Sequence, residues 1–202
     1  MEIEIKLGPV NVETAARVFA DPALEPCLGP VSITGMHTVY YDTPDRRLRR
    51  ERITLRLRKE GPRSVCTLKT GGENLEGLSQ RVELEQEAPD LETGLRAILQ
   101  MPELPAGVRP LLAAGSFAPT CGARFVRKEV RVTMEDVCFL LSFDQGELYA
   151  GDNTAPLGEI ELELCDGSVE GLVREARRLM ALYGLSYYPD SKQKRAAALE
   201  VR

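Results

Sequence analysis

Polar and apolar residues alternate with a two-residue period in several separate stretches of the chain. The alternation is clearest in residues 2–7, 53–58, 81–85, 126–132 and 159–164. Successive side chains of a β-strand point to opposite faces of a sheet, so each stretch predicts a strand with one apolar face. Two further strands are expected at Val65–Thr70 and Cys138–Asp144.

Helical periodicity is less frequent. Apolar residues recur at helical spacing in 12–20, 91–99, 109–114 and 169–183, and Ser168 is placed to cap the last of these helices. Turns are expected where small and polar residues cluster, at residues 43–45, 71–72, 144–146 and 151–153. The stretch from Pro102 to Pro119 is expected to be a helical insertion between strands. The fold class is therefore α+β and mainly β.

The polar positions of these strands are unusual because almost all of them are Glu, Arg or Lys. Glu159, Glu161 and Glu163 would lie on one face about 7 Å apart, where like charges repel unless cations intervene. Several such strands side by side indicate a closed or strongly curved sheet with a charged interior and an apolar exterior covered by helices. An open sheet with a salt-bridged outer face is the alternative.

A charged interior is costly because buried charges lose hydration and must be paired or bind ions. Carboxylates are hard oxygen ligands for Mg²⁺ or Mn²⁺, and Arg and Lys donate charge-assisted hydrogen bonds to phosphate oxygens. Both sets in one cavity indicate a receptor for a metal-bound polyphosphate. Removing one of the mutually repelling carboxylates, as in Glu4→Gln or Glu161→Gln, is expected to delete a ligand while leaving the fold intact.

Length and charge narrow the classes of protein. A chain of 202 residues suits a single domain spanning 1–202. The net charge of −5 argues against a nucleic-acid partner, although basic residues gather in 46–69 and acidic residues in 81–92 and 157–166. No apolar stretch approaches the roughly 20 residues of a membrane span, and no secretory leader is visible. We expect a cytoplasmic protein with no membrane partner.

The cysteines and the one histidine give no sign of a site. The five cysteines are scattered without CxxC spacing, so we expect reduced thiols, mostly as core filler. His37 lies in a segment that fits either a strand or a turn, and no partner for a catalytic role can be named.

The order of the charged motifs resembles the CYTH superfamily, the triphosphate tunnel metalloenzymes. The chain opens with the superfamily's ExExK signature, at Glu2, Glu4 and Lys6. In order, there follow YYDTPDRRLRRERITLRLRKEG from Tyr40, TLKT from Thr67, RVELE from Arg81, FVRKEVRV from Phe125, FDQGELYAG from Phe143, EIELEL from Glu159 and SKQKRA from Ser191. The similarity extends over nearly the whole chain. Its long segment between Glu87 and Arg124 resembles bacterial inorganic triphosphatases, without their helical CHAD domain.

This resemblance implies an eight-stranded antiparallel β-barrel tunnel that holds a triphosphate and one or two divalent metals. It implies that Glu2, Glu4 and Glu161 bind the first metal, with Glu163 and either Glu83 or Glu85 as candidates for a second. The family's catalytic set corresponds to Glu2, Glu4, Lys6, Glu161 and Glu163. The phosphate-binding set corresponds to Lys6, Arg56, Arg58, Lys69, Arg81 and Arg127, with Lys192 covering one tunnel end. Asp144 either points inward or caps a turn.

The function implied is metal-dependent hydrolysis of inorganic triphosphate to pyrophosphate and phosphate. A metal and basic residues would neutralise the phosphate oxygens while a carboxylate orients water. Within the family, a thiamine triphosphatase or a class IV adenylate cyclase is the alternative, with thiamine triphosphate or ATP as substrate. A non-catalytic polyphosphate- or nucleotide-binding module is the alternative from another class, but it would gain little from so many carboxylates.

Overall fold

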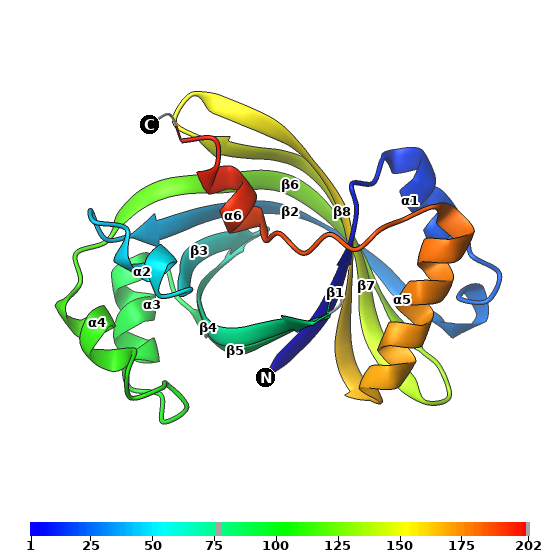
Figure 1. Ribbon diagram of the computed structural model, residues 1–202, viewed down its shortest axis with the longest axis horizontal. Coiled ribbons are helices and arrows are strands. Elements are labelled where there is room, and N and C mark those ends of the chain that lie inside the picture. Colours follow the sequence, from blue (N-terminus) through cyan, green and yellow to red (C-terminus); the bar gives the residue numbers. More distant parts are fainter. Residues whose placement is uncertain (76–77, 201–202) are drawn as a thin grey trace.

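The computed structural model describes residues 1–75 and 78–200, in which eight antiparallel strands form a closed barrel (Figure 1). The order around the barrel is β1-β5-β4-β3-β2-β6-β7-β8. The strands are β1 (Glu2–Leu7), β2 (Leu28–Asp42), β3 (Thr54–Glu60), β4 (Arg63–Leu75), β5 (Leu78–Glu87), β6 (Ala118–Thr133), β7 (Val137–Ala150) and β8 (Asn153–Gly167). The closed charged barrel expected from the alternation is confirmed, and the open sheet is excluded.

Strand β1 closes the barrel, because it pairs with β5 on one side and with β8 on the other. Glu2 lies opposite Arg81 of β5, and Lys6 lies opposite Glu161 of β8. In a closed sheet one face of every strand points inward. The charged positions of β1, β5 and β8 therefore converge on one interior.

Helices cover the apolar outside of the barrel on two opposite sides (Figure 1). On one side α1 (Val12–Phe19) and α5 (Val169–Tyr183) bury Val18 and Leu172 against Ile5, Leu7 and their neighbours. On the other side α2 (Arg47–Arg50), α3 (Leu91–Ile98) and α4 (Arg109–Ala114) pack against β3 and β4. A short 3₁₀ helix, η1 (Glu25–Cys27), leads into β2.

The last helix, α6 (Lys192–Ala197), packs inside the barrel. Its Ala196 and Ala197 contact Cys121, Ala123 and Leu148, whose side chains share the inward face with the charged positions of β6 and β7. The Ser191 hydroxyl accepts a hydrogen bond from the Lys194 amide and so caps the helix. The helix fills one end of the barrel and directs its first residue, Lys192, into the interior.

The four predicted helices are confirmed to within one residue at each end, and the Ser168 hydroxyl caps α5 by accepting from the Gly171 amide. The expected insertion contains α4, although Ala118 and Pro119 already belong to β6. Neither α2 nor α6 was predicted. The segment of His37, for which a strand and a turn were both left open, lies in β2.

Two predicted turns are wrong. Residues 144–146 lie in the middle of β7, where a Cβ at Gly146 would come within 2.1 Å of the Arg124 carbonyl oxygen. That glycine therefore allows the neighbouring strand to approach closely, and it does not form a turn. Gly71 and Gly72 form an irregularity within β4, with φ values of +68° and +110° and a register shift between Thr70 and Glu73. The expected turn at 43–45 is confirmed, and the one expected at 151–153 is confirmed for 151 and 152, since Asn153 already belongs to β8.

The five cysteines are free thiols, as expected, but only Cys66 and Cys121 are fully buried, and Cys165 is exposed. Cys27 is partly buried and packs against the core, so the description as core filler is wrong for Cys138 and Cys165 only. The His37 ring lies within 3.0 Å of the Tyr149 hydroxyl and does not line the barrel interior. None of the helices in the described part of the chain has the length and apolarity that a membrane span requires.

Candidate active site

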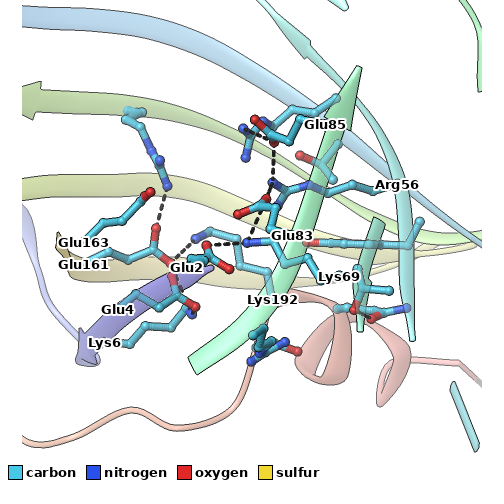
Figure 2. A pocket seen from close by; sticks show the side chains of 18 of the residues that line it. Glu2, Glu4, Lys6, Arg56, Lys69, Glu83, Glu85, Glu161, Glu163 and Lys192 are labelled. Carbon is cyan, nitrogen blue, oxygen red and sulfur yellow. Dashed lines mark hydrogen bonds and ion pairs between the residues drawn. The ribbon is translucent and has the colours of Figure 1, made fainter. Parts of the chain in front are cut away.

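The barrel interior holds a cavity of about 120 Å³ lined mainly by charged side chains (Figure 2). Every residue that the sequence singled out for the site lines this cavity. They are Glu2, Glu4, Lys6, Arg56, Arg58, Lys69, Arg81, Glu83, Glu85, Arg127, Glu161, Glu163 and Lys192. Lys59, between two inward arginines in the sequence, is exposed on the outside. The inward and outward positions were therefore predicted correctly, whereas the roles of these residues stay predictions.

Lys192 lies at the centre of the most heavily buried part of the site. Its ammonium group is 2.7 Å from Asp144 Oδ2 and 3.0 Å from Glu161 Oε1, and it also bonds Glu159. Burial alone would lower the pKa of Lys192, but these three carboxylates outweigh it and raise the pKa. The residue therefore carries a permanent positive charge inside the barrel.

Arg127 of β6 joins the same network. Its guanidinium donates to both Asp144 oxygens at 2.7 Å and to Glu161 Oε2 at 2.6 Å. Burial acts to raise the pKa of Glu161, but Lys192, Lys6 and Arg127 hold it well below its usual value. Asp144 is fully buried and points inward, which decides between the two positions expected for it.

A second group of ion pairs lies across the cavity (Figure 2). Lys69 Nζ lies 2.5 Å from Glu2 Oε1 and 3.1 Å from Glu83 Oε1, and Arg56 contacts Glu83 at 3.4 Å. The Arg56 Nε atom is buried without a hydrogen-bond partner. An unpaired buried donor is costly, so this arginine is held ready for an acceptor that enters the cavity.

Arg58 and Arg81 are also available to an anion. The Arg58 Nε donates to Glu60 at 2.6 Å, while Arg81 donates to the Ser79 hydroxyl at 3.0 Å. Within the described residues, no carboxylate pairs with Arg81. Burial lowers the pKa of Arg58, and the neighbouring Arg56 and Arg127 add to this. Closely spaced guanidinium groups of this kind favour a multiply charged anion between them.

Negative charge is uncompensated at the opposite part of the cavity, around Glu163. Burial raises the pKa of Glu163 to about 7, and the carboxylates of Glu2, Glu83 and Glu4 act in the same direction. The Glu2 Oε2 atom is buried without a hydrogen-bond partner. Figure 2 shows Glu2, Glu4, Glu161 and Glu163 side by side. Glu2 and Glu4 each contact one lysine, Lys69 and Lys6 respectively, whereas Glu163 has no ion-pair partner within the described part of the chain. The carboxylates here outnumber their cations, and this excess of negative charge fits a hard divalent metal.

A second acidic group, formed by Asp144, Glu159 and Glu161, has ligand atoms within 4.8 Å of one another. Its carboxylates are already bonded by Lys192, Arg127 and Arg195, so this group has the cations it needs. Only Glu161 belongs to both groups. The Glu2, Glu4 and Glu163 side is therefore the better candidate for a metal. Among the described residues its three carboxylates have only Lys6 and Lys69 as ion-pair partners, and both lysines are shared with other carboxylates.

Some residues of the site were not identified from the sequence. Glu159 is fully buried and bonds Lys192 and Arg195 behind the cavity. The alternation of Glu159, Glu161 and Glu163 along one strand could have identified Glu159 as a site residue. No pattern in the sequence pointed to Arg195. The neutral lining residues had no charge pattern to reveal them; they are Thr38, Tyr40, Thr54, Phe125, Ser191 and Gln193.

Comparison with known proteins gives a family match over almost the whole chain. The CYTH domain model matches residues 1–197. An inorganic triphosphatase of Haemophilus influenzae is 32% identical over 162 residues, which are 79% of this chain and 44% of the relative. The chain thus spans less than half the length of this curated relative.

Solved structures share the fold at lower identity. A Hippeastrum protein, provisionally named an adenylyl cyclase and described as having a dominant triphosphatase activity, superimposes with a TM-score of 0.73 at 22% identity, covering 100% of this chain and 98% of its own. A Bacillus halodurans protein provisionally named an adenylate cyclase gives a TM-score of 0.57 at 19% identity, covering 95% and 94%. The barrel, its charged interior and the family match together establish that this chain belongs to the CYTH domain family.

Proposed function

We propose that this chain hydrolyses inorganic triphosphate to pyrophosphate and phosphate with Mg²⁺ or Mn²⁺. The observation that carries the proposal is the lining of one small cavity by seven Lys and Arg side chains and six Glu side chains. Membership of the CYTH family implies a divalent metal, and the uncompensated carboxylates around Glu163 fit one. The identity to the Haemophilus inorganic triphosphatase supports the same activity.

Glu2, Glu4 and Glu161 would hold the first metal, and Glu163 with Glu83 or Glu85 a second. The metal would supply a Lewis acid that draws charge from the phosphate oxygens. Within the described residues the buried Glu2 Oε2 has no hydrogen-bond partner, so this oxygen would be available as a ligand. One of these carboxylates orients the water that attacks the terminal phosphorus.

The basic residues bind the phosphates along the tunnel. Arg56, Arg58, Lys69, Arg81 and Arg127 would share the phosphate oxygens, together with Lys6 and Lys192. Ion pairs, and for Arg81 the hydrogen bond to Ser79, hold these side chains in position before substrate arrives, so little reorganisation is needed in the transition state. No Ser or Cys nucleophile is required for attack by water.

The lining favours a bare triphosphate over a nucleotide. Its two aromatic residues are Tyr40 and Phe125. The Phe125 ring already faces Lys192 Nζ at 5.3 Å and the Arg127 guanidinium at 6.0 Å. Because Tyr40 is only 3% exposed and these cations already face Phe125, a base has little aromatic surface there on which to stack, and it would add bulk without compensating contacts. This ranks triphosphatase ahead of class IV adenylate cyclase, thiamine triphosphatase and a non-catalytic binding module.

The proposal treats 1–202 as one domain acting in the cytoplasm. The family match over residues 1–197 and the free thiols support this.

A substrate panel tests the ranking. We expect kcat/KM at matched free Mg²⁺ to be highest for triphosphate, lower for ATP and thiamine triphosphate, and lowest for pyrophosphate, which is too short to engage the whole basic set. Cyclic AMP as the main product from ATP, or thiamine triphosphate as the best substrate, would overturn the ranking. Tight binding of triphosphate without any product would identify a binding module instead.

A further inference from the structure

A second cavity, of about 690 Å³, opens next to the tunnel cavity. The two cavities are adjacent, since Thr54, Arg81, Ser191 and Gln193 line both. We call the second cavity the vestibule. Besides these four, its lining residues are Arg49, Arg52, Ile53, Gly71, Gly72, Ser79, Pro189, Asp190, Lys194 and Ala197. It is enclosed by α2, the irregular part of β4 and the start of α6.

The vestibule carries an excess of positive charge. Among the described lining residues the cations are Arg49, Arg52, Arg81 and Lys194, and the one acidic residue is Asp190, 2.5 Å from Lys194. Arg49 has only a long contact of 3.7 Å with Glu200. For Arg52, as for Arg81, no carboxylate partner is found among the side chains that the structure describes, those of residues 1–72 and 78–200. Cations without partners around an open cavity attract a polyanion.

Arg52 occupies a backbone position that suits glycine. Its φ is +56°, and α2 ends there with the Ile53 amide bonding the Leu48 carbonyl at 2.8 Å and the Arg52 amide bonding the Arg49 carbonyl at 3.2 Å. This pattern of helix closure normally has glycine at the left-handed position. An arginine is strained there, so helix closure does not explain its presence. Its exposed side chain borders the vestibule.

Gly72 allows Arg81 to lie at the boundary of the two cavities. Its φ of +110° is one that side-chain-bearing residues rarely adopt, and a Cβ there would come within 2.7 Å of Arg81 Cγ. The glycine therefore leaves the space that the Arg81 stem occupies. As a result, one guanidinium can contact phosphates on both sides of the boundary.

We propose that the vestibule binds the additional phosphates of a linear polyphosphate longer than triphosphate, whose end occupies the tunnel. The inference rests on the proposed function in placing the first phosphates in the tunnel. Within the described residues, no aromatic side chain lines the vestibule, so a nucleobase would find cations but no stacking partner. A chain of phosphates matches both the adjacency of the two cavities and the cations without described partners.

The test compares the dissociation constants of triphosphate, ATP and a defined linear polyphosphate several times longer than triphosphate, measured by calorimetry. Arg52→Gly and Arg49→Ala alter the vestibule. Arg47→Ala is the matched control, because Arg47 is exposed on the same helix but does not line the vestibule. Arg52→Gly should keep or raise the Tm, since glycine relieves the left-handed strain. A loss of binding in that variant then cannot be ascribed to unfolding.

We expect each vestibule variant to weaken binding of the long polyphosphate about fivefold, as for one exposed cation, and to leave triphosphate binding unchanged. The weakening should shrink at high salt. Equal losses for triphosphate and the long chain, or losses no larger than in Arg47→Ala, would overturn the proposal. So would a loss confined to ATP, which would assign the vestibule to a nucleoside. Because binding is measured without turnover, a protein that fails to hydrolyse triphosphate but shows this pattern refutes the proposed function alone.

Discussion

The excess of negative charge around Glu163 should make the stability of the metal-free protein depend on pH. The pKa of Glu163 in the folded, metal-free protein is raised from 4.5 to about 7 by burial and by Glu2 and Glu83. The folded state therefore binds more protons than the unfolded state in this range. The resulting contribution to stability is fully present below the unfolded pKa and is lost as the pH rises to about 7.

We therefore expect the Tm of the metal-free protein to fall as the pH rises from 4.5 to about 7, and Glu163→Gln to reduce that fall. Saturating Mg²⁺ should restore the wild-type Tm at the upper end, because the cation takes the place of the proton. Thermal unfolding in chelator and in Mg²⁺ measures both effects. An identical pH profile in the variant would show that Glu163 does not titrate in this range.

Glu161 should respond in the opposite way, although it lies on the same strand. The expectation that removing an inward carboxylate mainly relieves repulsion fits Glu163 but not Glu161, which is bonded by Lys192 and Arg127. Glu161→Gln leaves these buried cations short of a partner, at a cost of about 3 kcal/mol or more. Chemical denaturation at pH 8 in chelator should show Glu161→Gln less stable and Glu163→Gln at least as stable as the wild type. Equal destabilisation would contradict the two assignments.

Arg56 and Lys59 provide a matched pair from one strand. Arg56 is buried and lines the tunnel, whereas Lys59 is exposed outside it. Arg56→Ala should remove about 1.5 to 3 kcal/mol of charge-assisted binding, about a ten- to hundredfold loss of kcat/KM for triphosphate. Lys59→Ala should stay within about twofold of the wild type. Steady-state kinetics measures kcat/KM for both variants. Similar losses of kcat/KM in Arg56→Ala and Lys59→Ala would rule out phosphate binding by Arg56.

Among the secondary-structure elements, those with a local charge pattern could be predicted from the sequence, and those placed by tertiary contacts could not. Strands β1 and β8 carry their charges in strict alternation. Strand β2 has neutral inward residues such as Thr38 and Tyr40, so its inner face could not be recognised. Helix α6 is too short for an apolar period, and its position inside the barrel depends on Cys121 and Ala123, far away in sequence.

The position of α6 should matter more for activity than for stability. Ala196 is fully buried against Ala123 and Leu148, so Ala196→Leu should push the helix outward at a cost of about 1 to 3 kcal/mol. Lys192 would then lose its contacts with Asp144 and Glu161. Ala198→Leu is the control, because Ala198 is exposed on the turn that ends the same helix. Triphosphate turnover should fall severely in the first variant only; full turnover would show that α6 does not position the site.

For the molecule as a whole, closing the barrel and assembling the site are one event. Strand β1 supplies Glu2, Glu4 and Lys6 and is also the strand that joins β5 to β8. The candidate site could be predicted almost completely, because inward charges alternate along each strand and the family motifs identify the strands. Which charges are paired could not be predicted: the saturated network around Lys192 and the uncompensated group around Glu163 depend on how β6, β7 and α6 meet.

The measurement that tests the central claim most directly is the metal dependence of triphosphate hydrolysis, with both products followed by phosphorus NMR. The uncompensated carboxylates predict no turnover in excess chelator and full turnover when Mg²⁺ or Mn²⁺ is restored, with one pyrophosphate and one phosphate formed for each triphosphate consumed. Undiminished turnover in excess chelator would contradict the metal site. Failure to form pyrophosphate and phosphate at any metal concentration would contradict the proposed hydrolysis itself.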